Sequence, residues 1–86
     1  MSTSHRFHLI GIGGAGMSVV AELLKDRGLE VSGSDQKDSP VLDHLRSVGV
    51  KVFVGHDAAH VPAGSVVVVS TAVRETNPEL AYARKE

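Results

Sequence analysis

Phe7-His8-Leu9-Ile10-Gly11-Ile12-Gly13-Gly14-Ala15-Gly16-Met17-Ser18 is the stretch that decides the fold. The residues before Gly11 predict a short buried strand, and the glycines predict a loop that leads into a helix. In this context Gly11 permits a tight turn, Gly13 lets the backbone approach a phosphate, and Gly16 lets the helix pack against the strand. A lone GxGxxG motif would be weak, but this arrangement predicts nucleotide binding.

The start of this helix predicts an anion site. Free amide groups from Gly14 to Ser18, with the positive end of the helix dipole behind them, suit a pyrophosphate without any lysine. The net charge is only -1, from nine Lys and Arg against ten Asp and Glu. Such a balance gives no electrostatic reason to bind nucleic acid or an anionic membrane, so neither is an expected partner.

The rest of the chain alternates strand and helix patterns with short links. This alternation predicts right-handed βαβ units in one α/β domain, residues 1–86, which is a Rossmann-like three-layer fold. Its sheet is expected to be mostly parallel with four or five strands and a ligand crevice at their carboxyl ends, and the valine run is expected to be buried on both faces. The predicted strands are residues 7–10, 30–34, 50–54 and 65–70, and the predicted helices are residues 17–27, 40–48 and 77–86.

Two further groups of residues are candidates for ligand contact. Asp35 ends the second predicted strand nineteen positions after Gly16, where an acid commonly accepts hydrogen bonds from a ribose or a base. The alternative is that Asp35 caps a turn, as Asp often does, and Ser34 is grouped with it. Ser70-Thr71-Ala72 ends the valine strand beside the expected switch point in strand order, where contact with phosphate or sugar and an ordinary strand-end turn are about equally favoured.

Several kinds of site are not expected. The sequence has no cysteine, which suits a cytoplasmic protein, and its longest apolar run, Val66–Val69, is far too short to span a bilayer. His56 and His60 are four apart, but no carboxylate and third histidine complete a metal site, so they are predicted to be solvated loop residues. Because His5, His8 and His44 are scattered and no Ser-His-acid set can be assembled, no catalytic residue is expected.

Three separated motifs carry a resemblance to a known family: residues 8–18, residues 33–39, and residues 67–73 with Asn77-Pro78-Glu79. They resemble the amino-terminal domain of the Mur ligase family, within it the UDP-N-acetylmuramate–L-alanine ligases. The resemblance implies that residues 13–18 hold the pyrophosphate of UDP-N-acetylmuramate, residues 34–39 lie near the uridine and residues 70–72 near the sugar. The substrate-binding residues it implies are Gly11, Gly13, Gly14, Ala15, Gly16, Met17, Ser18, Ser34, Asp35, Gln36, Ser39, Ser70, Thr71 and Ala72.

The resemblance also implies what these residues lack. In the intact family, which builds peptidoglycan for the bacterial cell wall, a central domain binds ATP and Mg²⁺ and activates the muramate carboxylate as an acyl phosphate. A third domain helps to position L-alanine. The sequence contains no GxxxxGK[ST] loop and stops in a helical pattern without a capping residue, so we expect a fragment with no cofactor of its own, inactive without its missing domains.

Two alternatives stay open on the glycine motif alone. It fits NAD or FAD as well as a nucleotide sugar, because each presents a pyrophosphate to the helix and a ribose near the second strand. The first alternative is therefore the NAD-binding domain of an oxidoreductase. The second is a regulatory module that senses a nucleotide.

Overall fold

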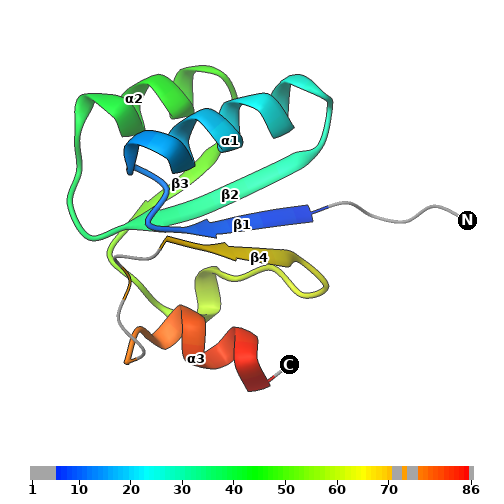
Figure 1. Cartoon of the computed structure of the whole chain (residues 1–86), viewed down its shortest axis with the longest axis vertical. Helices are drawn as coiled ribbons and strands as arrows, with labels where there is room; N and C mark the ends of the chain where they lie inside the picture. Colours follow the sequence, from blue (N-terminus) through cyan, green and yellow to red (C-terminus); the bar gives the residue numbers. More distant parts are fainter. Residues whose placement is uncertain (1–5, 71–72, 74–75, 86) are drawn as a thin grey trace, which may run out of the picture.

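The chain folds as a parallel sheet flanked by helices (Figure 1), and the computed structural model describes residues 6–70, 73 and 76–85. The described strands all run parallel in the order β3-β2-β1-β4, which confirms the expected α/β class with four strands. The elements are β1 (Arg6–Ile10), α1 (Ala15–Asp26), β2 (Glu30–Asp35), α2 (Pro40–Ser47), β3 (Lys51–Val54), the short 3₁₀ helix η1 (Ala58–His60), β4 (Val66–Val69) and α3 (Pro78–Lys85).

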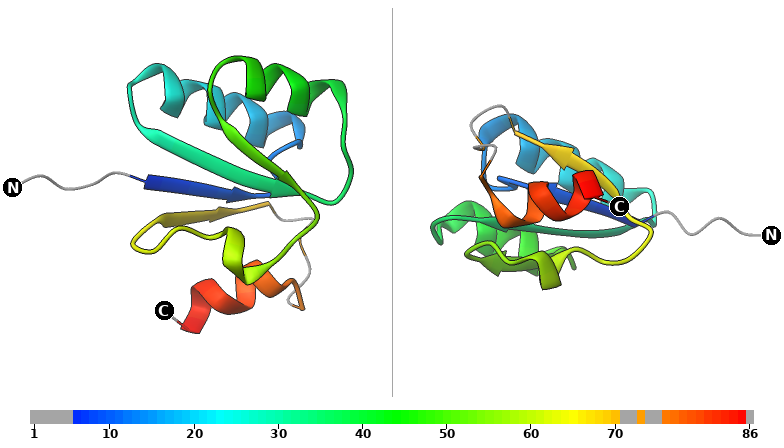
Figure 2. Two further views of the ribbon diagram at one scale, coloured as in Figure 1. Left: turned by 180° about the vertical axis from the view of Figure 1, so that it is seen from behind. Right: turned by 90° about the horizontal axis from the view of Figure 1, so that it is seen from below.

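The sheet has two unlike faces because side chains alternate along a strand. α1 and α2 cover one face, and α3 with η1 covers the other (Figures 1 and 2). On the α1 and α2 side, Leu9 and Val31 join an apolar core. On the α3 side, the same strands place His8, Ser32 and Ser34, all buried. The other buried members of the apolar core are Ile12, Ala21, Leu42, Leu45 and Val50.

Gly33, rather than Gly16, is the glycine that close packing requires. A Cβ added to Gly33 would lie 2.5 Å from Cδ1 of Ile12 and 2.6 Å from the carbonyl oxygen of Leu9. A Cβ added to Gly16 would meet nothing within 4 Å, so the expectation that Gly16 packs the helix onto the strand is wrong. The tight turn expected at Gly11 is confirmed, since its φ of 84° is in the left-handed region that favours glycine.

β4 lies at an edge of the sheet and is not buried on both faces as expected. In the described part of the chain it pairs with β1, and Val66 is 54% exposed while the next three valines are half-buried. Consecutive β-branched residues favour a strand, but their pattern carries no information about where in the sheet that strand lies. No helix of the described residues is long and apolar enough to cross a membrane.

Candidate functional site

A cleft of about 590 Å³ opens at the carboxyl ends of the strands. β2 and β4 flank β1 on opposite sides, so the strand order reverses at β1, and such a switch point is where open α/β sheets bind ligands. Five of the predicted site residues line the cleft: Gly11, Gly14, Asp35, Gln36 and Ser70. The other lining residues, which sequence reasoning did not select, are His56, Val73, Thr76, Asn77 and Pro78.

The first turn of α1 supplies hydrogen-bond donors beside this cleft. Gly14 is the N-cap residue, with extended backbone at φ -65° and ψ 152°, and it has no side chain to cap the turn. Its own N–H donates to the Gly11 carbonyl at 3.1 Å, and the Ser18 N–H donates to the Gly14 carbonyl at 2.8 Å. Between them, the N–H groups of residues 15–17 have no acceptor in the described part of the chain. The expected donor set from Gly14 to Ser18 therefore narrows to these three, which suit an anion.

Asp35 adopts the turn-capping role that was its alternative. Its Oδ2 accepts a hydrogen bond from the Gly13 N–H at 2.8 Å, and its Oδ1 accepts from the Lys37 N–H at 3.4 Å. The carboxylate thus ties the end of β2 to the glycine loop while still lining the cleft. A Cβ on Gly13 would lie 2.9 Å from Oδ2 of Asp35, so the close approach at Gly13 is to this carboxylate.

The predicted serines are largely engaged within the protein. The hydroxyl of Ser39 accepts from the Leu42 N–H at the start of α2, and that of Ser18 donates to the Ala15 carbonyl. Ser34 is completely buried and is not among the residues that line the cleft, so the expected contact between its side chain and a ligand is not supported by the structure. Met17 packs against the apolar core. Thr71 and Ala72 lie outside the described residues.

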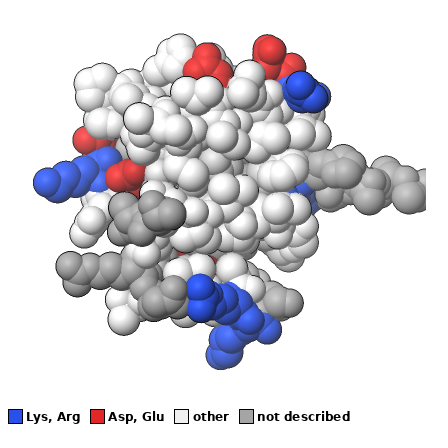
Figure 3. Space-filling model, viewed as in Figure 1, with Lys and Arg blue, Asp and Glu red and all other residues white. Residues whose placement is uncertain are grey.

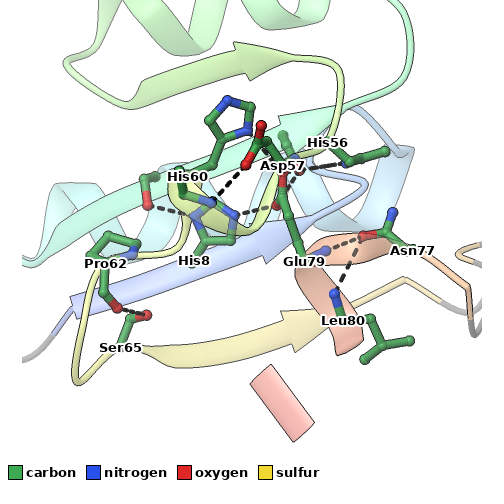
Figure 4. Close-up of polar contacts among 12 residues, drawn as sticks. His8, His56, Asp57, His60, Pro62, Ser65, Asn77, Glu79 and Leu80 are labelled. Atoms are coloured by element: carbon green, nitrogen blue, oxygen red, sulfur yellow. Dashed lines mark hydrogen bonds and ion pairs between the residues drawn. The ribbon is translucent and has the colours of Figure 1, made fainter. Parts of the chain in front are cut away.

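A buried carboxylate, Glu79 of α3, organises the polar face of the sheet (Figure 4). Its Oε1 accepts hydrogen bonds from Nε2 of His8 and from the hydroxyl of Ser34, both at 2.6 Å. Its Oε2 accepts from the Asp57 N–H at 2.9 Å and from Nδ1 of His60 at 3.0 Å. One side chain therefore joins β1, β2 and the loop around η1 to the start of α3.

The ionisation of Glu79 follows from these contacts. Burial alone raises the pKa of a carboxyl group, because it penalises the charged form. The hydrogen bonds from His8, Ser34, the Asp57 amide and His60 outweigh burial and lower the pKa of Glu79 from 4.5 to about 2. Glu79 is consequently a carboxylate at neutral pH.

The histidine expectations need correction. His56 and His60 were expected to be solvated, yet their side chains are only 17% and 23% exposed and both face Glu79. The His60 ring also stacks on Phe53 with the ring centroids 4.0 Å apart. His8, which is far from His56 and His60 in the sequence, is buried in the same cluster. The group went unrecognised because its members are up to 71 positions apart. The available signal was the alternation of His8 in β1 and of Ser32 and Ser34 in β2 with apolar residues or glycine, which places these three polar side chains on one face.

Asn77 is a cleft residue that the sequence did not mark as one. Its Oδ1 accepts from the N–H groups of Glu79 at 2.9 Å and Leu80 at 3.3 Å, so it caps α3 as well as lining the cleft. Asn77 therefore connects the cleft that it lines to the buried carboxylate of Glu79, two residues later in the chain.

A second hollow of about 620 Å³ lies over α1 and the end of α2. It is remote from the glycine loop, and aliphatic and charged side chains line it without a converging set of polar groups, so the cleft at the strand ends is the stronger candidate. The residues that line the hollow are Val19, Glu22, Leu23, Lys25, Asp26 and Val48.

The surface at the carboxyl end of the sheet is of mixed charge. On the face drawn in Figure 3, both Lys or Arg and Asp or Glu side chains occur at this end, at the left.

Comparison with known proteins agrees with the motifs. Residues 6–86 match the model of the Mur ligase family, catalytic domain. The UDP-N-acetylmuramate–L-alanine ligase of Kineococcus radiotolerans is 58% identical over 83 residues, which cover 93% of this chain and 18% of that protein. The corresponding ligase of Rubrobacter xylanophilus is 55% identical over 80 residues, again 93% of this chain and 18% of the relative.

Solved structures show the same relationship. The crystal structure of UDP-N-acetylmuramate-alanine ligase from Thermotoga maritima superposes with a TM-score of 0.88 at 38% identity, covering 93% of this chain and 19% of that one. A murein peptide ligase from Psychrobacter arcticus gives a TM-score of 0.86 at 31% identity, covering 94% and 17%. The chain thus spans under a fifth of these relatives, and it belongs to the Mur ligase family.

Proposed function

We propose that these residues bind UDP-N-acetylmuramate, as the nucleotide-sugar domain of a ligase that joins L-alanine to this substrate in peptidoglycan synthesis. The observation that carries the proposal is the cleft at the strand-order switch point, with the unbonded amides of residues 15–17 beside it. The names of the relatives support the choice of substrate. Since the match covers 18% of those relatives, binding rather than catalysis is the role assigned to this chain.

The proposed placement of the ligand follows the donors and acceptors of the cleft. The pyrophosphate takes the amides of residues 15–17, because a helix N-terminus stabilises anions without a lysine. The uridine lies toward Asp35 and Gln36, and the sugar lies toward Ser70. In this placement Asp35 keeps its bond to the Gly13 N–H and holds the loop in the binding conformation.

The chemical step is assigned to the rest of the enzyme. We place ATP and Mg²⁺ in a further domain, where the muramate carboxylate would be activated as an acyl phosphate for attack by L-alanine. This chain contributes no GxxxxGK[ST] loop to hold ATP. Its own contribution is to fix the substrate by its nucleotide end, and we place this chain in the cytoplasm.

Calorimetric titration of the chain with UDP-N-acetylmuramate, UDP and NADH tests the proposal. We expect both uridine ligands to bind, UDP-N-acetylmuramate more tightly, and NADH not to bind. Binding of NADH alone would replace the proposal with the oxidoreductase alternative. Absence of heat with all three would contradict the idea that these residues hold the ligand unaided.

The variant Ala15→Pro tests the amide site specifically. Ala15 is the first residue of α1, where proline is tolerated, and Gly14 before it already has the extended backbone that precedes proline. The substitution therefore removes one donor without breaking the helix. Loss of one hydrogen bond to a charged group predicts affinity for UDP weaker by about tenfold or more. Asp26→Asn, at the other end of the same helix, is the control and should bind like the unaltered chain.

A further inference from the structure

The Glu79 cluster fixes the position of protons as well as of side chains. An ionised carboxylate has acceptor sites only, so every group that contacts it must donate. The hydrogen on His8 therefore lies on Nε2, 2.6 Å from Oε1, and that on His60 lies on Nδ1, 3.0 Å from Oε2. Ser34 likewise donates its hydroxyl hydrogen to Oε1 at 2.6 Å.

Ser34 passes this constraint on to His56. A serine hydroxyl has one hydrogen, and that of Ser34 is already committed to Glu79. Nδ1 of His56 lies 2.7 Å from the same hydroxyl oxygen, which is hydrogen-bond distance. The hydrogen of this second bond must come from Nδ1, so the neutral His56 ring carries its hydrogen there and has a lone pair at Nε2.

We propose that Glu79, acting through Ser34, is a positioning residue that holds His56 in the Nδ1–H tautomer, so that Nε2 serves the cleft as a hydrogen-bond acceptor. His56 lines the cleft, and its Nε2 has no partner within the described part of the chain. Among the described residues, the only buried side-chain nitrogen or oxygen atom without a partner is Nε of Arg6. Since Nε2 of His56 also has no partner, it must be accessible rather than buried.

The tautomer determines which ligand group this wall can take. An acceptor at Nε2 pairs with a hydroxyl or an imide N–H and is repelled by a phosphoryl oxygen. This inference rests on the proposed function, in which the ligand is a UDP-sugar that offers ribose hydroxyls and a uracil N–H. The phosphates then belong at the first turn of α1, and the donor-bearing part of the ligand belongs beside His56.

Nitrogen NMR of the ¹⁵N-labelled chain without ligand at neutral pH tests the tautomer directly. Long-range proton–nitrogen correlations separate the nitrogen that carries hydrogen from the one with the lone pair. We expect His56 and His60 to show hydrogen on Nδ1 and His8 on Nε2. Hydrogen on Nε2 of His56, or averaging between its two nitrogens, would overturn the proposal. Since no ligand is present, this result is independent of whether the cleft binds a UDP-sugar.

Two substitutions test the route from Glu79 to His56. In Glu79→Gln one end of the side chain becomes a donor. The Ser34 hydroxyl can then donate to Nδ1 of His56 instead, so His56 is no longer restricted to the Nδ1–H tautomer. In Ser34→Ala, Nδ1 of His56 keeps only the distant Oε2 of Glu79, 3.6 Å away, so the tautomer is again lost while His60 keeps hydrogen on Nδ1. His44, exposed on α2, is the internal control and should not change. If Glu79→Gln does not fold, Ser34→Ala decides, and an unchanged His56 in a folded variant would refute the relay.

Ligand analogues identify the donor that His56 accepts. The analogues 2′-deoxy-UDP, 3′-deoxy-UDP and N3-methyl-UDP each lack one hydrogen-bond donor of UDP: a ribose hydroxyl in the first two and the uracil N–H in the third. We expect one analogue to bind the unaltered chain several-fold more weakly than UDP, and this difference to vanish in His56→Ala. If every analogue binds like UDP while the tautomer is confirmed, the ligand contact is refuted and the positioning of His56 stands.

Discussion

Acidification should remove a defined part of the stability through Glu79. Its pKa is lowered on folding from 4.5 to about 2, so in this interval the unfolded chain binds a proton that the folded chain does not. Stability from Glu79 is therefore fully present above pH about 4.5 and is lost as the pH falls through about 2. At about 1.4 kcal/mol per pH unit, the shift corresponds to about 3 kcal/mol of the free energy of unfolding.

The magnitude is large for a chain of this size. Domains are stable by about 5 to 15 kcal/mol, and small ones lie at the lower end, so losing about 3 kcal/mol brings the chain close to unfolding. The side chain of Glu79 is completely buried, and solvent does not screen its hydrogen bonds as it screens surface pairs. The effect should consequently survive physiological salt.

Urea unfolding followed by circular dichroism, repeated from neutral pH down to pH about 2, measures this contribution. The unaltered chain should show a steep loss in the window, and Glu79→Gln should show a smaller one by about 3 kcal/mol. Glu22→Gln is the matched control, because Glu22 also faces a histidine, His44 at 3.1 Å, but on the exposed surface. If the pH profiles of the unaltered chain and Glu79→Gln are parallel, the reasoning about Glu79 is refuted.

Three further predictions concern stability, each checked by thermal unfolding. Gly16→Ala, inside a helix with nothing near the added methyl, should raise the free energy of unfolding by about 1 kcal/mol, whereas Gly33→Ala should lower it by about 3 kcal/mol; equal effects would contradict the assignment of the packing glycine. Ser39→Ala should cost about 1 kcal/mol through the lost cap, and no change in midpoint would exclude a capping role. Gly13→Val should lose about 1 to 3 kcal/mol because its side chain would displace Asp35, and a variant as stable as the parent would contradict that contact.

Local patterns in the sequence were sufficient for the elements and the class of fold. Ser39 followed by Pro40 marks the start of α2, and Gly28 and Gly49 adopt the left-handed backbone at helix ends, with φ of 83° and 96°. These features act within a few residues, so they can be read without knowing the tertiary structure. The glycine loop and its place after β1 were predictable for the same reason.

Features that depend on distant residues were not predictable in this way. Gly16 fits the motif, but whether packing requires a glycine depends on the atoms that lie near it in the folded chain. Ile12 and the Leu9 carbonyl leave no room for a side chain at Gly33, whereas Gly16 has space beside it. The cluster of Glu79 with His8 and His60 forms only when the sheet and α3 have come together. The position of β4 at the edge depends on strand order, which its valines do not encode.

The attachment of α3 through Glu79 has a consequence for how that helix can sit. The buried residues of α3 are Glu79 and Leu80, so little apolar surface holds it to the sheet. Apolar contacts have no preferred direction and tolerate sliding and rotation. A buried carboxylate that accepts four hydrogen bonds is restricted to one position, because moving it would leave buried polar groups without partners. The hydrogen bonds of Glu79 therefore locate α3 at its first turn, whereas its last turn carries the charged residues Arg84 and Lys85 and no buried residue.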